Sequence, residues 1–215
     1  MVGGGAIANI ALPAFTVLFV TIGPLDVAPL FIALTPGAAE AKRREFAVKG
    51  TMIAGLVLLA FAFGGSELMT LLGISFPAFR IAGGILLLLL AIDLVFAHRT
   101  GLSSITQTEE REAGREADIS VFPLAIPLLA GPGAITAVVL LMGNQDDNAM
   151  GQVVVVAVLL LVLAITVALL FAAGALVRYL RVTGINVLTR VSGILLAALA
   201  AQFLLDGLRQ SHLFG

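Results

Sequence analysis

The sequence predicts an all-α integral membrane protein with six transmembrane helices, arranged as two inverted three-helix repeats. Three observations support this fold class. Of the 215 residues, 60% are hydrophobic and only 12% are charged, which is about half the charged fraction of a soluble domain. The charged residues lie in clusters between long uncharged stretches. Two glycine-containing landmarks also recur in the second half of the chain at nearly the same spacing.

The uncharged stretches are long enough for helices to cross a hydrocarbon core, which takes about 20 apolar residues. Because they are continuously apolar, they favour helices over the alternating strands of a transmembrane barrel. The expected spans cover residues 6–34, 46–66, 76–97, 120–143, 152–177 and 185–208.

The distribution of Lys and Arg predicts the orientation, since cytoplasmic loops retain positive charge. The first, third and fifth loops and their flanks carry Lys42, Arg43, Arg44, Lys49, Arg99, Arg111, Arg115, Arg178, Arg181 and Arg190. The other side has Arg80 and Arg209, and its fourth loop contains Asp146 and Asp147 without a cation. We therefore expect a multi-pass protein of the cell membrane with both termini on the non-cytoplasmic side.

The domain organisation follows from the long hydrophilic connection at 98–119, which has mixed charge and no wide apolar face. We interpret it as a cytoplasmic linker, because such a segment cannot bury enough apolar surface to fold alone. It separates a first three-helix repeat, 1–97, from a second, 120–215.

The two landmarks indicate the repeat. Gly23-Pro24 in the first span is followed after 108 residues by Gly131-Pro132 in the fourth. Arg80-Ile81-Ala82-Gly83 is followed after 110 residues by Arg190-Val191-Ser192-Gly193. Because each unit crosses the membrane three times, the second copy starts on the opposite side and is inverted relative to the first. Many secondary transporters have this architecture. The alternative is that these short matches arise by chance, because membrane spans use few residue types.

Spans one and four are expected to be broken near the midplane. Proline removes a backbone donor and glycine permits non-helical angles, so Gly23-Pro24 is a point of unwinding. In the fourth span, Pro123, Pro127 and the Gly131-Pro132-Gly133 run make a continuous helix improbable. A simple kink is the alternative interpretation at each site.

The breaks predict a binding site, because non-helical backbone within a membrane is tolerated where it lines a cavity. Free carbonyls attract cations and free N–H groups attract anions, so a small zwitterionic solute suits both. We expect free N–H groups at 25–27 and 133–135. The predicted substrate-binding residues are Thr21, Ile22, Gly23, Pro24, Leu25, Asp26, Ala130, Gly131, Pro132, Gly133, Ala134 and Thr136.

Asp26 is the acidic residue of the first span and falls at the start of its second half-helix. A carboxylate inside a membrane is a functional candidate that can accept a substrate ammonium, hold a coupling ion or carry a proton. Alternatively, Asp26 only caps the half-helix.

Other embedded polar residues are expected to make structural contacts. Interhelical hydrogen bonds are the prediction for Thr16, Thr51, Thr136, Thr166, Ser192 and Gln202. Arg80 and Arg190 are expected to extend to the membrane interface.

Several classes of chemistry are excluded or disfavoured. The chain has no Cys, which excludes disulfides, thiolate metal sites and dithiol redox chemistry, and its net charge of −1 disfavours nucleic acid. The two histidines, His98 and His212, lack metal-ligand spacing. We expect no metal and no cofactor beyond a coupling ion, H⁺ or Na⁺. The expected partners are the solute and the lipid bilayer. A homo-oligomer is a further possibility.

The segments TIGPLDVAPLFIALTPG at 21–37 and FPLAIPLLAGPGAIT at 122–136 resemble the paired motifs of the MarC family. The resemblance extends over essentially the whole chain. It implies a six-span inner-membrane protein and, from members of the SnatA type, transport of small neutral amino acids of the glycine, alanine, serine and threonine class. The first motif departs from the family pattern, since Gly23 stands where an acidic or amide residue is common.

The leading hypothesis is therefore a secondary transporter of small neutral amino acids that works by alternating access. A membrane channel or a structural membrane protein is the main alternative. An intramembrane aspartyl protease that pairs Asp26 with Asp93 or Asp206 is a third, disfavoured because the predicted topology places those carboxylates at different depths.

Overall fold

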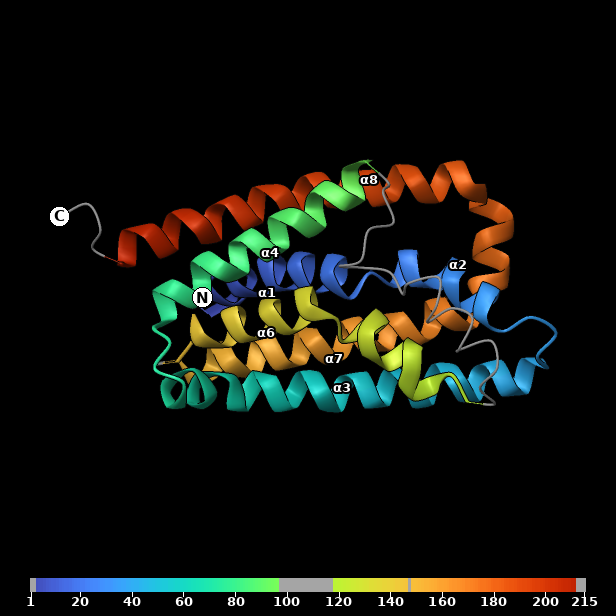
Figure 1. Ribbon diagram of the computed structural model, residues 1–215, viewed down its shortest axis with the longest axis horizontal. Helices are drawn as coiled ribbons and strands as arrows, with labels where there is room; N and C mark the ends of the chain where they lie inside the picture. The colour runs from blue at the N-terminus through green and yellow to red at the C-terminus, as the bar shows by residue number, and fades with distance from the viewer. Residues whose placement is uncertain (1–2, 97–117, 147, 212–215) are drawn as a thin grey trace.

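The computed structural model describes residues 3–96, 118–146 and 148–211, which form a bundle of long helices (Figure 1). The first half contains α1 (Gly3–Ile22), α2 (Pro24–Leu34), α3 (Glu40–Leu71) and α4 (Phe76–Phe96). The second half contains η1 (Ser120–Leu129), α6 (Pro132–Gly143), α7 (Ala149–Phe171) and α8 (Ala173–Gln210). Most of the predicted linker, 98–117, lies outside the described residues.

The predicted fold class is confirmed. Within the described ranges the chain is helical and has no strand. Five helices are long and apolar enough to cross a membrane, and six if the bent pair η1 and α6 is one span. Many large apolar side chains face outward, including Leu12, Leu56 and Phe63, which are at least 60% exposed. Such exposure suits a lipid environment and would be unfavourable in water.

The helices of the second and fifth spans differ from the prediction. The helix of the second span begins at Glu40, six residues before the expected apolar stretch, because a helix continues into water where charged side chains are solvated. The fifth span ends at Phe171 and not at residue 177. The first turns of α8 then cross the end of the bundle (Figure 1), and the segment Thr183–Gln210 of this helix is long and apolar enough to cross a membrane. An apolar run does not show where a helix changes direction.

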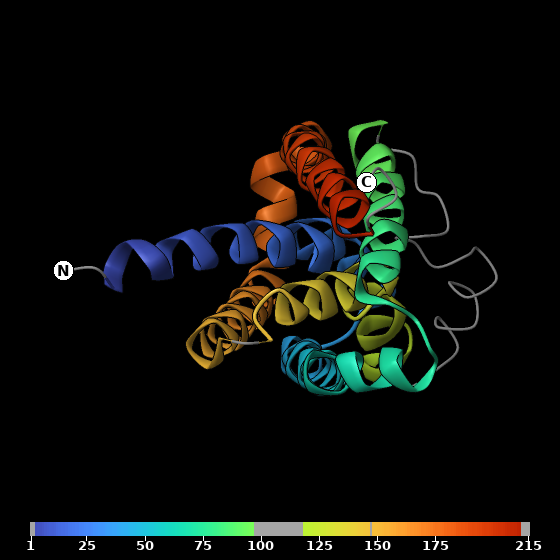
Figure 2. The same ribbon diagram turned by 90° about the vertical axis from the view of Figure 1, so that its left-hand side faces the viewer.

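Helices α4 and α8 pack side by side along their length (Figures 1 and 2). Glycines make this close approach possible. A Cβ on Gly84 would lie 3.1 Å from the carbonyl oxygen of Ala200, and one on Gly193 would lie 3.0 Å from that of Ala91. Small residues let helices approach in this way in membranes, where packing drives helix association.

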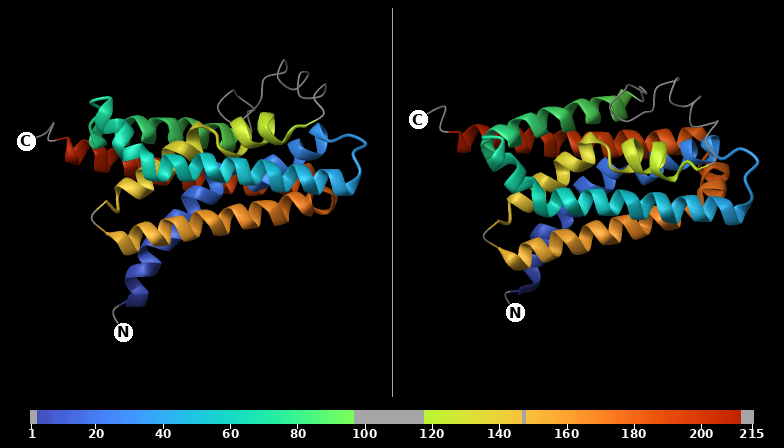
Figure 3. Two further views of the ribbon diagram at one scale, coloured as in Figure 1. Left: turned by 90° about the horizontal axis from the view of Figure 1, so that it is seen from below. Right: turned by 60° about the horizontal axis from the view of Figure 1, so that its bottom comes forward.

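Several contacts between the two halves have a counterpart. Helix α3 of the first half packs on the broken pair η1 and α6 of the second, and α7 of the second half packs on the broken pair α1 and α2 of the first. In the same way, α4 packs on α6, and α8 packs on α2. Helices α3 and α7 run in opposite directions (Figure 3). These are the contacts expected of inverted copies, although the duplication and the membrane orientation stay predictions.

Candidate functional site

The first break is a single left-handed residue. Gly23 separates α1 from α2 with φ 61° and ψ 48°, a conformation that glycine adopts without strain. Its carbonyl oxygen accepts hydrogen bonds from the N–H groups of Asp26 at 3.0 Å and Val27 at 2.9 Å. The prediction that these two N–H groups are free is therefore wrong, because Gly23 is the N-cap residue of α2 and its carbonyl starts the new helix.

The second break is larger. Within η1, Phe122 and Ile126 have extended backbone angles, as expected for residues that precede proline. The chain then bends by 57° between η1 and α6. Gly131 precedes α6, and its carbonyl accepts a hydrogen bond from the N–H of Ile135 at 3.0 Å. The predicted free N–H group of Ile135 is therefore also wrong.

A cavity of about 40 Å³ lies between the two breaks. Residues of the first break meet residues of the second across it. Its lining consists of Val20, Thr21, Ile22, Gly23, Asp26, Val27, Leu90, Leu94, Pro127, Leu128, Gly131 and Gly133. Since one water needs about 10–15 Å³ of such space, the cavity has room for a few waters and no large solute in this conformation.

Six of the predicted binding residues thus line one cavity: Thr21, Ile22, Gly23, Asp26, Gly131 and Gly133. The others are placed differently. Pro24 and Leu25 line a smaller cavity of about 10 Å³. Ala130 and Ala134 are buried, Pro132 is exposed, and the methyl group of Thr136 packs against Gly83 of α4.

Asp26 lies at both cavities and contacts the second half of the chain. Its Oδ1 accepts a hydrogen bond from Oγ1 of Thr189, a buried residue of α8. Thr189 and Ser192 line the smaller cavity together with Asp26. The carboxylate therefore joins α2 to α8 as well as facing the space between the breaks.

Sequence reasoning missed Thr189, and it missed the apolar wall that Leu90 and Leu94 of α4 form. A signal existed for Thr189, because it directly precedes the repeated Arg190 to Gly193 landmark. No comparable signal existed for the two leucines, which lie within a leucine-rich run.

Several embedded polar residues differ from the prediction. Thr16 and Thr166 donate to the carbonyls of Leu12 and Val162 within their own helices. Gln202 likewise donates to Asp206 on the same helix. A helical hydroxyl can reach the carbonyl four residues earlier, and side chains four residues apart lie on the same helix face. The predicted interhelical bonds are therefore wrong for these residues.

Arg80 also differs from the prediction. It is only 6% exposed and donates to Oδ1 of Asn144, at the end of α6. Its guanidinium carbon lies 4.8 Å from the centre of the Phe76 ring. Tertiary packing therefore encloses the side chain of Arg80, whereas that of Arg190 is exposed and its place at the membrane interface stays a prediction.

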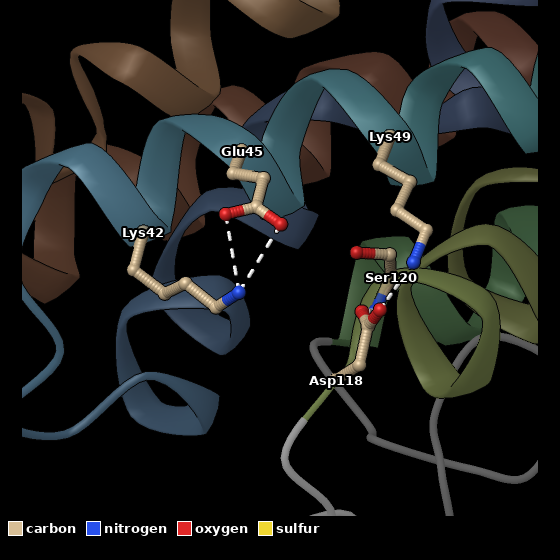
Figure 4. Close-up of polar contacts among 5 residues, drawn as sticks. All are labelled: Lys42, Glu45, Lys49, Asp118 and Ser120. Atoms are coloured by element: carbon tan, nitrogen blue, oxygen red, sulfur yellow. Dashed lines mark hydrogen bonds and ion pairs between the residues drawn. The ribbon is translucent and has the colours of Figure 1, made fainter.

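An ion pair connects the start of η1 to α3. The ammonium of Lys49 donates to Oδ2 of Asp118, whose other oxygen accepts the N–H of Ser120 at 3.0 Å (Figure 4). These hydrogen bonds hold the pKa of Asp118 well below its usual value, because they stabilise the ionised carboxylate. The contact helps to place the irregular segment that leads to the second break.

The cavity offers limited chemistry. Of the described residues that line the two small cavities, Asp26 is the only carboxylate. The described part of the chain contains no group of three His, Cys, Asp or Glu side chains that would hold a metal ion. Asp26 can attract a cation, and the N-terminus of α6 at Gly133 can attract an anion.

Apolar spans, two interrupted helices and a small internal cavity together define a multi-pass α-helical membrane protein. The family described as MarC family integral membrane protein matches residues 8–212, and the chain belongs to this family. No solved structure matches the chain significantly.

Its relatives cover nearly the whole chain. A UPF0056 membrane protein of Methanocaldococcus jannaschii is 40% identical over 198 residues, 91% of this chain and 94% of its own length. The UPF0056 inner membrane protein YhgN of Escherichia coli is 35% identical over 201 residues, 94% of this chain and 97% of its own. The UPF0056 membrane protein YvbG of Bacillus subtilis is 33% identical over 195 residues, 91% and 92% of the two chains.

Proposed function

We propose that the protein is an inner-membrane secondary transporter of small neutral amino acids, coupled to H⁺ or Na⁺. The observation that carries this proposal is the cavity between the two breaks, with Asp26 on one side and Gly133 on the other. The resemblance of both break motifs to transporters of the SnatA type supports the same class of substrate.

The two sides of the cavity differ in electrostatic character. Asp26 supplies a carboxylate for an ammonium group or a coupling ion. Opposite it, α6 begins at Pro132, and the first N–H groups of a helix lack partners within that helix. Together with the helix dipole, the N–H of Gly133 favours a carboxylate. A zwitterion with one group of each charge can satisfy both sides at once.

The size of the cavity favours a small solute. Leu90 closes tightly over Gly133, since a Cβ on this glycine would lie 2.8 Å from the leucine Cδ2. The cavity must therefore widen before an amino acid enters. We propose that α4 moves relative to α6 during the transport cycle, which opens the cavity to alternate sides of the membrane.

The experiment is a flux assay in proteoliposomes with labelled glycine, alanine, serine and threonine under a H⁺ or a Na⁺ gradient. Saturable, gradient-dependent flux is expected. In Asp26→Asn the flux should become weaker or insensitive to the ion, whereas Glu45→Gln, an exposed carboxylate on α3, should behave as wild type. Unchanged ion dependence in Asp26→Asn would assign Asp26 a capping role.

The same assay tests the alternatives. A channel would conduct without saturation, and a structural protein would carry no flux under either gradient. The aspartyl protease needs a second carboxylate beside Asp26. Among the described residues that line the cavities beside Asp26 there is none, so no observation favours that activity.

A further inference from the structure

A larger cavity lies at the end of the bundle where α3 begins and α7 passes into α8. Its volume is about 230 Å³. The residues that line it are Ile32, Glu40, Arg43, Arg44, Leu170, Phe171, Gly174 and Ala175. It shares no residue with the cavity between the breaks, so the proposed substrate site does not account for it.

Two arginines of α3 supply the polar side of this cavity. Arg44 pairs with Glu40 at 2.5 Å and lies 5.7 Å from the centre of the Phe171 ring. Arg43 is half-buried, and its Nη2 donates to the carbonyl of Thr35 at 3.2 Å. With one carboxylate and two guanidinium groups, the lining has an excess of positive charge.

Arg43 has unused hydrogen-bonding capacity. Its Nε is buried and has no hydrogen-bond partner among the described residues. A buried donor without an acceptor is unfavourable, and a bound oxygen atom would satisfy it. A guanidinium binds phosphate through two parallel N–H groups, so an anionic oxygen ligand fits this donor.

The rest of the lining is apolar and lies at the expected membrane boundary. Ile32, Leu170 and Phe171 line the cavity beside the arginines. The adjoining first turns of α8 carry exposed Arg178 and Tyr179, the latter 84% exposed. Basic and tyrosine side chains are typical of the level of the lipid headgroups.

We propose that this cavity binds the headgroup phosphate of an anionic phospholipid. The guanidinium groups of Arg43 and Arg44 hold the phosphate, and Ile32, Leu170 and Phe171 contact the glycerol and first acyl carbons. A free phosphate ion would use the arginines alone and leave the apolar side uncovered. The bound lipid joins the start of α3 to the junction of α7 and α8.

Lipid binding is measured by native mass spectrometry of the purified protein titrated with phosphatidylglycerol or with phosphatidylcholine. Phosphatidylglycerol should bind more tightly, because choline cancels the phosphate charge. Arg43→Gln should weaken phosphatidylglycerol binding about fivefold to tenfold, and Arg43→Lys should weaken it less. The matched control is Lys42→Gln, since Lys42 is exposed on the same turn and pairs with Glu45 at 3.1 Å.

Equal binding of the two lipids, or unchanged binding in Arg43→Gln, would overturn the proposal. Displacement of the lipid by inorganic phosphate alone would indicate a free phosphate site and would overturn it too. If Arg43→Gln does not fold, the test is the Tm of the wild type in each of the two lipids, measured by circular dichroism. Phosphatidylglycerol should raise the Tm above its value in phosphatidylcholine, and equal Tm values would contradict lipid binding.

Discussion

At the scale of single residues, the hydrogen bond between Thr189 and Asp26 connects the two halves of the chain beside the candidate site. A hydrogen bond to a charged group is stronger than one between neutral groups. Its loss would leave the carboxylate of Asp26 with one donor fewer. Thr189 is therefore a positioning residue for Asp26.

We expect Thr189→Val to lower the free energy of unfolding by about 1.5–3 kcal/mol and to reduce amino acid flux. The matched control is Thr166→Val, because the buried hydroxyl of Thr166 donates to the carbonyl of Val162 within its own helix. Thermal unfolding and proteoliposome flux provide the two measurements. If both variants lose stability and flux equally, Thr189 has no special role at Asp26.

The substitution Gly23→Ala tests whether stability and transport require a residue with positive φ at the first break. Gly23→Ala should lower stability by about 1–2 kcal/mol, because a Cβ disfavours positive φ. Gly37 has a similar φ of 70° with nothing near its missing Cβ, so Gly37→Ala should cost a similar amount. Only Gly23→Ala should also reduce flux, and equal flux in the two variants would contradict a functional break.

At the scale of elements, the ion pair of Lys49 and Asp118 fixes the start of η1 against α3 (Figure 4). The two residues are 69 positions apart in the sequence. Both side chains are partly exposed, so solvent screens their attraction and the expected stabilisation is below about 1 kcal/mol.

The pH dependence of this pair has a definite sign. The folded state lowers the pKa of Asp118, so its contribution is fully present above the unfolded pKa of about 3.9 and declines below it. The stability difference between wild type and Asp118→Asn should therefore be constant near neutral pH and shrink below about pH 4. Thermal unfolding across this range measures it, and a difference that grew on acidification would contradict the contact.

At the scale of the whole molecule, the predicted orientation follows from charge and can be tested directly, because the chain has no native cysteine. Ser75 lies in the α3–α4 connection and Pro36 in the α2–α3 connection, and both are exposed. In intact cells a membrane-impermeant maleimide should label Ser75→Cys. It should label Pro36→Cys only after permeabilisation. The reverse pattern would invert the topology.

Much of the fold was predictable because its signals are local. A long apolar stretch favours a helical span whatever surrounds it, and proline changes the backbone next to it. The extended angles at Phe122 and Ile126 follow from the prolines after them. The end of α7 at Phe171 was not predictable, since the same apolar run continues through a change in direction.

The sequence by itself determined the membrane environment, the approximate spans and the positions of both breaks, because each depends on neighbouring residues. Only the tertiary structure decided which side chains meet at those breaks. Thr189 reaches Asp26, Leu90 covers Gly133, and Arg80 is enclosed beside Asn144, through packing between distant segments. Local sequence patterns do not identify such partners, because the residues are distant in the sequence and come within contact distance only when the helices pack.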